Sequence, residues 1–223
     1  MIKILYFTIE GQLEQSLWNS YLKKLPSNLQ SNVTKYYRWQ DQYSNLFGKL
    51  LLKHGLIEYG YGDDCLDLLN YNSFKKPFID KKTYFNLSHS SEIVICAFSQ
   101  KDEIGIDIEE IKENKDFHDI LPLFFTIHEQ NKILDAKNSV TEFYKLWTRK
   151  EAVLKAMGVG LNFKLNEIDV CNNKIKNDSL NVPDLHIKSY KKNNSFISIA
   201  TTLIPQIRLF EVSNINFLNF FSA

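Results

Sequence analysis

The segment 143–160, FYKLWTRKEAVLKAMGVG, predicts a helix that ends at Gly158. At about 100° per residue, its apolar side chains fall in one arc, which must pack against other elements of a folded domain. The arc contains Phe143, Leu146, Trp147, Val153, Leu154 and Met157. Lys150 lies in the middle of this arc, and Glu151 and Lys155 lie one turn apart on its edge.

These three charges have two interpretations. A buried ammonium group is costly unless a partner meets its charge. In the first interpretation, the stem of Lys150 packs on the core while its ammonium group reaches water, and Glu151 and Lys155 form an ordinary surface pair. In the second, all three belong to a functional site. The helix alone does not decide between them.

The charge balance narrows the class of protein. The 223 residues carry 27 Lys and Arg against 26 Asp and Glu, so the net charge of +1 favours neither nucleic acid nor a membrane surface. The first residues lack the pattern of a signal peptide, and no apolar run reaches the roughly 20 residues of a membrane span. Three scattered cysteines have no metal-ligand spacing. We therefore expect a soluble, cytoplasmic protein.

Apolar periodicity predicts strands and helices in both halves of the chain. The expected strands are 1–10, 83–87, 93–98, 104–111, 163–170, 186–190, 195–201 and 207–212. The expected helices are 13–25, 29–38, 41–59, 126–137 and 143–160. Thr126 and Glu129 have the spacing of a capping box. Each half supplies one long helix that ends near a glycine, which hints at an internal duplication. We predict an α+β (mixed α/β) fold of two similar subdomains, residues 1–103 and 104–223, with a cleft between them.

The segment GIDIE, residues 105–109, is the first candidate for chemistry. Its isoleucines alternate with Asp107 and Glu109, so both carboxylates point to one face of a strand, with Cβ atoms roughly 7 Å apart. Magnesium typically takes one or two carboxylates and completes its shell with water and phosphate. The alternative is an amphipathic strand with a wet acidic face.

Two further segments are candidates for binding an anion. Ser88 and His89 lie in NLSHS at an expected strand end, where a hydroxyl, an imidazole and turn N–H groups can hold a phosphate. The alternative is a plain polar turn, and the absence of a GxSxG elbow argues against a catalytic triad. In Lys75-Lys76-Pro77, the proline fixes the backbone and a lysine can reach an anionic ligand.

Taken in order, the pieces are KKP at 75–77, FNLSHS at 85–90, GIDIE at 105–109, FF-x3-E at 124–129 and W-x2-KE-x3-K at 147–155. This order and spacing resembles the 4′-phosphopantetheinyl transferases, specifically the monomeric surfactin-type class, over essentially the whole chain. The resemblance implies two α/β subdomains related by a pseudo-twofold. It also implies transfer of the phosphopantetheine arm of coenzyme A to a serine of an apo acyl or peptidyl carrier protein, with release of adenosine 3′,5′-bisphosphate.

The resemblance also assigns roles to residues. Asp107, Glu109 and Glu151 would hold one Mg²⁺, and Lys150 and Lys155 would neutralise phosphates of coenzyme A. Glu151 would accept the proton of the attacking serine, directly or through water. Further contacts to coenzyme A would come from Lys75, Lys76 and Pro77 by the adenosine and from Ser88 and His89 at phosphate oxygens, including the 3′-phosphate.

This chain departs from the family pattern in its first half. Family members often carry a basic stretch after the first helix and an arginine before the glycine of the second, where this chain has Ser44 or Asn45. We therefore expect weakened phosphate contacts there, with only Lys35 and Arg38 nearby. Two other functions remain open: a different Mg²⁺-dependent phosphotransfer or nucleotidyl transfer, and a non-catalytic carrier-protein or nucleotide-binding relative. Retention of the three carboxylates argues against the binder.

Overall fold

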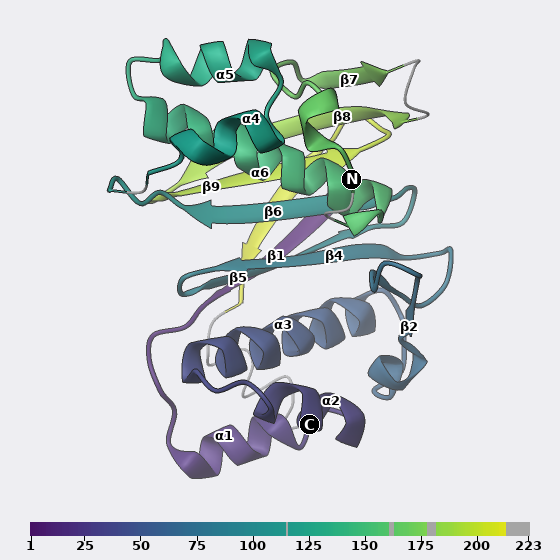
Figure 1. Cartoon of the computed structure of the whole chain (residues 1–223). Coiled ribbons are helices and arrows are strands. Elements are labelled where there is room, and N and C mark those ends of the chain that lie inside the picture. The colour runs from purple at the N-terminus through teal and green to yellow at the C-terminus, as the bar shows by residue number, and fades with distance from the viewer. Residues whose placement is uncertain (115, 161–162, 178–181, 213–223) are drawn as a thin grey trace.

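In a computed structural model of the protein, the structure describes residues 1–114, 116–160, 163–177 and 182–212 (Figure 1). Most of the strands form two four-stranded sheets. The first sheet has the order β10-β1-β5-β4, the second has the order β6-β9-β8-β7, and β2 pairs with β3 alone. The predicted mixed α/β fold class is confirmed.

The strands are β1 (Ile2–Thr8), β2 (Asn70–Tyr71), β3 (Pro77–Phe78), β4 (Tyr84–Ser90), β5 (Ile93–Ser99), β6 (Ile104–Glu110), β7 (Lys174–Asn177), β8 (Val182–Lys192), β9 (Ser195–Thr201) and β10 (Ile207–Glu211). The α-helices are α1 (Gln15–Leu22), α2 (Ser27–Thr34), α3 (Trp39–Glu58), α4 (Leu121–Phe124), α5 (Ile127–Leu134) and α6 (Ser139–Met157). Short 3-10 turns are η1 (Cys65–Leu68), η2 (His118–Ile120) and η4 (Leu165–Glu167). Within the described residues, every helix is too short or too polar to span a bilayer.

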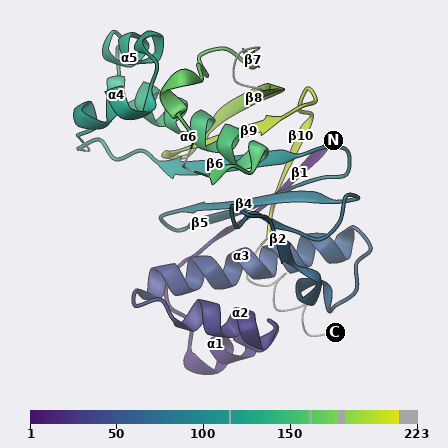
Figure 2. The same ribbon diagram turned by 45° about the vertical axis from the view of Figure 1, so that its right-hand side comes forward.

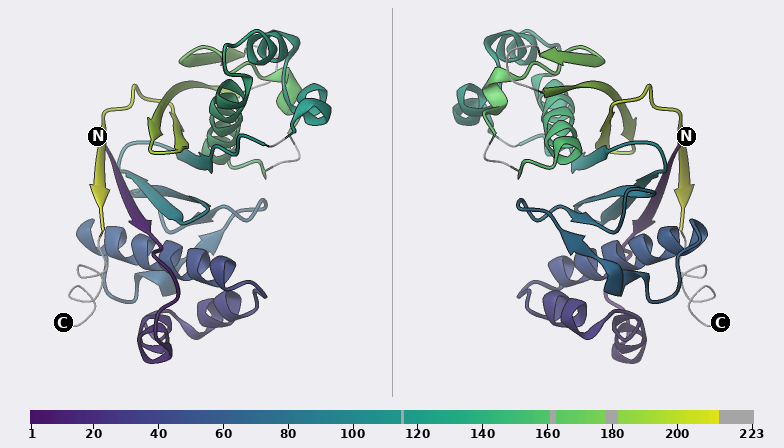
Figure 3. Two further views of the ribbon diagram at one scale, coloured as in Figure 1. Left: turned by 90° about the vertical axis from the view of Figure 1, so that its left-hand side faces the viewer. Right: turned by 90° about the vertical axis from the view of Figure 1, so that its right-hand side faces the viewer.

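The elements stack as helix, sheet, sheet, helix, with an apolar core at each junction (Figure 3). Helix α3 packs on the first sheet through buried leucines such as Leu46 and Leu50, and α6 packs on the second through residues such as Phe143 and Val153. The two sheets meet through a layer of mainly isoleucine side chains. These are Ile2, Ile4, Tyr6, Ile95, Ala97, Ile104, Ile106, Ile108, Ile197 and Ile199. Alternation along the strands therefore gives each sheet two buried faces.

The ends of α6 follow from local sequence. The side chain of Asn138 accepts a hydrogen bond from the N–H of Thr141 at the N-terminus. Gly158 ends the helix with φ of 67°, in the left-handed region that favours glycine. The predicted glycine stop is confirmed, as is the capping box of Thr126 and Glu129 at the start of α5.

The last strand returns to the first half of the chain. β10 pairs in parallel with β1, so residues 207–211 belong to the first sheet (Figure 2). The subdomain boundary at residue 103 and the pseudo-twofold relation stay predictions. The structure adds that β10, from the second half of the sequence, belongs to the first sheet, and that an apolar layer joins the two sheets.

The predicted end of one strand and the prediction of another strand are wrong. The strand expected to stop before SHSS continues through Ser90, because β4 pairs with β5 up to the contact of Ser90 with Ile93. The strand expected at 163–170 is absent from the described residues 163–170, which contain the 3-10 turn η4. There Leu165 and Ile168 are buried, although no strand forms.

Candidate active site

A cleft consists of two adjoining pockets, of which the first lies between the two halves of the molecule and the second lies within the first half. The first has a volume of about 270 Å³ and is lined by the 74–77 segment on one side and by Glu151, Leu154 and Lys155 of α6 on the other. The second, of about 210 Å³, lies between α3 and β4. Pro77 and Asn86 line both pockets. The predicted cleft is therefore present, and it contains residues of both halves.

The two sheets are joined at this cleft by side chains. Asn86, Ser88 and Ser90 are every second residue of β4, and their side-chain oxygens accept hydrogen bonds from backbone N–H groups of β6 at 2.9, 3.4 and 2.9 Å. The donors are Ile106, Ile108 and Glu110, in that order. This joint explains why β4 extends through the SHSS segment, and it fixes β4 beside the acidic strand.

The same contact between β4 and β6 orients the carboxylates of β6. The Ser88 hydroxyl donates to Asp107 Oδ1 at 2.8 Å, and the Ser90 hydroxyl donates to Glu109 Oε2 at 3.0 Å. Lys155 Nζ donates to Asp107 Oδ1 at 2.7 Å and to Ser88 Oγ at 2.9 Å. Asp107 and Glu109 thus point toward β4 as the two-residue period predicts, and α6 adds a cation to the group.

Glu151 completes this acidic cluster from α6. Burial raises the pKa of Glu151 to about 7, and the charge of Asp107 adds to the rise, while Lys155 opposes it. Asp107 is 3 % exposed, and its Oδ2 has no hydrogen-bond partner among the described residues. Three neighbouring carboxylates, one of them paired with Lys155 and carrying an unpaired buried oxygen, suit a hard divalent cation such as Mg²⁺.

The 72–77 loop closes one end of the first pocket. Asn72 Oδ1 accepts from the N–H groups of Phe74 and Lys76, and Asn72 Nδ2 donates to the carbonyl of Gly158 at 3.1 Å. Lys76 Nζ pairs with Glu103 and donates to the carbonyl of Ala156 at 3.2 Å. Lys76 therefore ties the loop to the end of α6, whereas Lys75, exposed and with φ of 64°, lines the pocket with no side-chain partner among the described residues.

The second pocket contains a cation that the sequence analysis did not identify as a candidate. Lys49 lines it together with Ser88 and His89. Burial lowers the pKa of Lys49, and among the described residues its ammonium group has no ion-pair partner. Partial burial and the charge of Lys155 lower the pKa of His89. Asn45, one turn before Lys49, also lines the pocket and carries an unpaired buried Oδ1.

Lys49 bears on the expectation that phosphate contacts are weakened in the first half of the chain. Asn45 stands about where the family arginine is expected, and Lys49 follows it by four residues on the same face of α3. This four-residue spacing is the sequence signal that could have identified Lys49 as a candidate. The second pocket therefore contains one positive charge from α3, four residues after the expected position of the arginine.

The expectation that Lys150 meets a phosphate of coenzyme A is wrong. Lys150 is 0 % exposed, and its Nζ lies 2.7 Å from Glu129 Oε2. It also donates to the carbonyl oxygens of Leu165 at 2.8 Å and Ile168 at 2.6 Å. These three partners use all three donors of the ammonium group. The apolar arc does face the core, and Lys150 is buried with it as half of an internal ion pair.

Several known proteins and one family model are similar to this chain in sequence. A family model described as the 4′-phosphopantetheinyl transferase superfamily matches residues 103–201. The 4′-phosphopantetheinyl transferase gsp of Aneurinibacillus migulanus is 30 % identical over 180 residues, covering 78 % of this chain and 73 % of that protein. The 4′-phosphopantetheinyl transferase Sfp of Bacillus subtilis is 29 % identical over 196 residues, covering 86 % of each.

Among solved structures, the holo-[acyl-carrier-protein] synthase of Thermotoga maritima matches with a TM-score of 0.34 at 17 % identity, covering 44 % of this chain and 61 % of that one. So partial an overlap supports no argument about this protein. The similarity to gsp extends over most of both sequences and includes the strand and helix that carry the acidic cluster. The chain therefore belongs to the 4′-phosphopantetheinyl transferase family.

Proposed function

We propose that this transferase moves the 4′-phosphopantetheine arm of coenzyme A to a serine of an apo acyl or peptidyl carrier protein. The observation that carries the proposal is the cluster of Asp107, Glu109, Glu151 and Lys155, of which Glu151 and Lys155 line the cleft between the halves. In the reaction, the serine oxygen forms a bond to the phosphorus of the phosphopantetheine arm, and the bond from that phosphorus to the bridging oxygen breaks. Adenosine 3′,5′-bisphosphate leaves with the electron pair of that bond.

Asp107, Glu109 and Glu151 would hold one Mg²⁺, since the unpaired Oδ2 of Asp107 and the crowding of the carboxylates fit such an ion. When bound, Mg²⁺ supplies positive charge to the pyrophosphate oxygens, where phosphoryl transfer needs it most. Ser88 and Ser90 orient two of the carboxylates through their hydroxyl groups. The ligand set thus depends on β4 as much as on β6.

The remaining contacts are assigned by their place in the cleft. Lys155 would neutralise phosphate oxygens beside Asp107, and Glu151 would accept the proton from the carrier serine. Lys75 and Pro77 line the first pocket and would lie by the adenosine, with Lys76 fixing their loop. Ser88, His89 and Lys49 line the second pocket and would meet the 3′-phosphate.

A mass assay tests the function. The purified protein is mixed with coenzyme A, Mg²⁺ and a panel of apo acyl and peptidyl carriers, and we expect at least one carrier to gain the mass of one phosphopantetheine. Asp107→Asn keeps a side chain that can bond Ser88 but removes the charge, so we expect at least about a hundredfold slower transfer. Glu110→Gln is the matched control, because Glu110 is on the same strand and pairs with Ser91 outside the cluster.

Failure of every carrier to gain mass would contradict the transferase proposal and favour the non-catalytic binder. Transfer at the wild-type rate by Asp107→Asn would overturn the metal assignment alone. The expectations of a cytoplasmic monomer that binds neither nucleic acid nor membrane stay predictions.

A further inference from the structure

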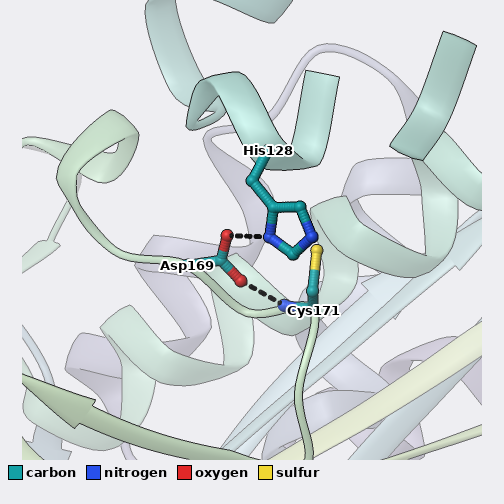
Figure 4. A group of neighbouring side chains, drawn as sticks. All are labelled: His128, Asp169 and Cys171. Atoms are coloured by element: carbon teal, nitrogen blue, oxygen red, sulfur yellow. Dashed lines mark hydrogen bonds and ion pairs between the residues drawn. The ribbon is translucent and has the colours of Figure 1, made fainter. Parts of the chain in front are cut away.

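A second group of metal-ligating side chains lies outside the cleft. His128 comes from the first turn of α5, and Asp169 and Cys171 come from the segment that precedes β7 (Figure 4). One donor atom from each residue lies within 4.8 Å of the other two. None of the three lines the two pockets of the cleft. The transferase activity therefore gives no reason for this grouping.

Hydrogen bonds of the surrounding backbone hold the group in place. Asp169 Oδ2 accepts from Thr126 Oγ1 at 3.0 Å and lies 2.8 Å from His128 Nδ1. Asp169 Oδ1 accepts from the N–H of Cys171 at 2.9 Å. The N–H of Val170, between the two ligand candidates, donates to the buried Glu129 at 2.8 Å. The start of α5 and the 169–171 segment are thus already joined, which keeps the three donor side chains close together before any ion binds.

The group is open to solvent on one side. The side chain of His128 is 64 % exposed and that of Asp169 is 34 % exposed, whereas Cys171 is 9 % exposed. An ion can therefore approach past the imidazole without opening the core. The 2.8 Å contact between His128 Nδ1 and Asp169 Oδ2 is shorter than the roughly 3.3 Å between ligands in a tetrahedral site with bonds of about 2.0–2.1 Å. Rotation of the exposed imidazole, with loss of its contact to Asp169, would provide this extra separation.

The chemistry of the donors selects the kind of ion. Imidazole nitrogen and thiolate sulfur suit borderline and soft divalent metals, whereas Mg²⁺ prefers oxygen ligands alone. One thiolate and one carboxylate balance the charge of a divalent ion. Three protein ligands leave a fourth tetrahedral position for water. This donor set differs from the all-carboxylate cluster of the cleft, so the two sites should separate metals by type.

A cysteine nucleophile is the alternative for the same residues, because His128 lies between a carboxylate and a thiol. Burial raises the pKa of the Cys171 thiol to about 12, and the neighbouring Asp169 adds to the rise. A reactive cysteine needs the opposite, an environment that favours the thiolate. Without a cation beside it, Cys171 therefore stays a thiol, which argues against nucleophilic catalysis, whereas a bound divalent ion itself supplies the charge that deprotonates a coordinating thiol.

We propose that His128, Asp169 and Cys171 bind one divalent ion of the zinc class and that this ion joins the first turn of α5 to the segment before β7. The proposal is independent of the transferase function. The ion would act as a cross-link in the second half of the molecule, at a distance from the reacting groups.

Cobalt(II) is the probe, because a cobalt–thiolate bond gives a charge-transfer band in the near ultraviolet that oxygen ligands do not give. The full-length protein is freed of metal by a chelator and titrated with Co²⁺. We expect a band that saturates at one equivalent and disappears on addition of Zn²⁺. Cys171→Ser should lose the band, and the matched control Cys65→Ala should keep it, because Cys65 is fully buried in the other half. Asp107→Asn should also keep it.

His128→Ala is the second variant, since an exposed imidazole can be removed without disturbing the core. We expect it to weaken Co²⁺ binding at least about tenfold, whether or not Cys171→Ser folds. Absence of the band in the wild-type protein, an unchanged band in Cys171→Ser, or unchanged affinity in His128→Ala would each overturn the proposal.

Discussion

Lys150 and Glu151 are neighbours in the sequence, yet they serve different parts of the molecule. Successive residues of a helix point about 100° apart, so Lys150 faces Glu129 in the core while Glu151 lines the cleft. The apolar arc on α6 correctly predicted that Lys150 is surrounded by core residues. It could not identify the partner, because Glu129 lies 21 positions away and its capping box already explained its place. Glu129 both caps α5 and pairs with Lys150, since its Oε2 accepts from Thr126 N–H and from Lys150.

The Lys150–Glu129 pair should matter for stability and not for ligand binding. Lys150→Met leaves the carboxylate of Glu129 buried without its cation, so we expect the free energy of unfolding to fall by about 3–5 kcal/mol. The double variant Lys150→Met/Glu129→Gln removes both charges and should recover part of the loss, since glutamine still serves the capping box. Urea unfolding measures both. A large loss of coenzyme A affinity in Lys150→Met, with unfolding unchanged, would return Lys150 to the phosphate site.

At the scale of elements, the contact between α6 and β6 sets the distance between the two segments that carry the acidic cluster. A Cβ atom added to Gly105 would lie 1.9 Å from the carbonyl oxygen of Ala152 and 2.3 Å from the nitrogen of Ala156. Both atoms belong to the backbone of α6, so no side chain can move aside. Gly105 therefore lets the helix carrying Glu151 and Lys155 lie directly on the strand carrying Asp107.

Gly105→Ala should push α6 away from β6. We expect a lower melting temperature and a free energy of unfolding reduced by about 1–3 kcal/mol or more. We also expect slower transfer by the folded protein, because Glu151 and Lys155 shift. Circular dichroism melting and the carrier mass assay measure the two effects. Gly48→Ala is the matched control for stability: its nearest contact would be 3.4 Å, and alanine in α3 should keep or raise the melting temperature. Equal melting of Gly105→Ala and the wild type would contradict the close-packing argument.

The elements show where sequence reasoning is sufficient and where it is not. Long periodic segments such as α3, α6 and the two strands of the β8–β9 hairpin were predicted, because one buried face leaves a regular pattern. The SHSS segment was misjudged because its polar residues suggested a turn. In the structure, Ser88 and Ser90 bond to β6, some 20 residues away, and no local pattern specifies such a partner. The shared face of Asp107 and Glu109 was predicted because a two-residue period is a local pattern. Lys49 was missed because its pocket forms only when α3 and β4 pack together.

At the scale of the whole molecule, the cleft draws charges from both halves. Lys49 on α3 lies in the second pocket and Lys155 on α6 lines the first, and the pockets meet at Pro77 and Asn86. A ligand that fills both pockets would contact both halves at once. The isoleucine layer and the side-chain joint between β4 and β6 hold the halves in register, so the two cations are positioned before the ligand arrives.

The contribution of Lys49 can be separated from that of the rest of the cleft by the choice of ligand. Since Lys49 shares its pocket with Ser88 and His89, which we assign to the 3′-phosphate, Lys49→Met should raise the Kd for coenzyme A about tenfold or more. It should leave the Kd for coenzyme A lacking the 3′-phosphate unchanged. Lys53→Gln is the matched control, because Lys53 is one turn further on α3 and its ammonium group pairs with Asp63 at 2.9 Å, away from this pocket. Calorimetry measures all affinities, and urea unfolding checks that each variant is folded. Equal weakening of both ligands, or none of coenzyme A, would show that the 3′-phosphate does not bind beside α3.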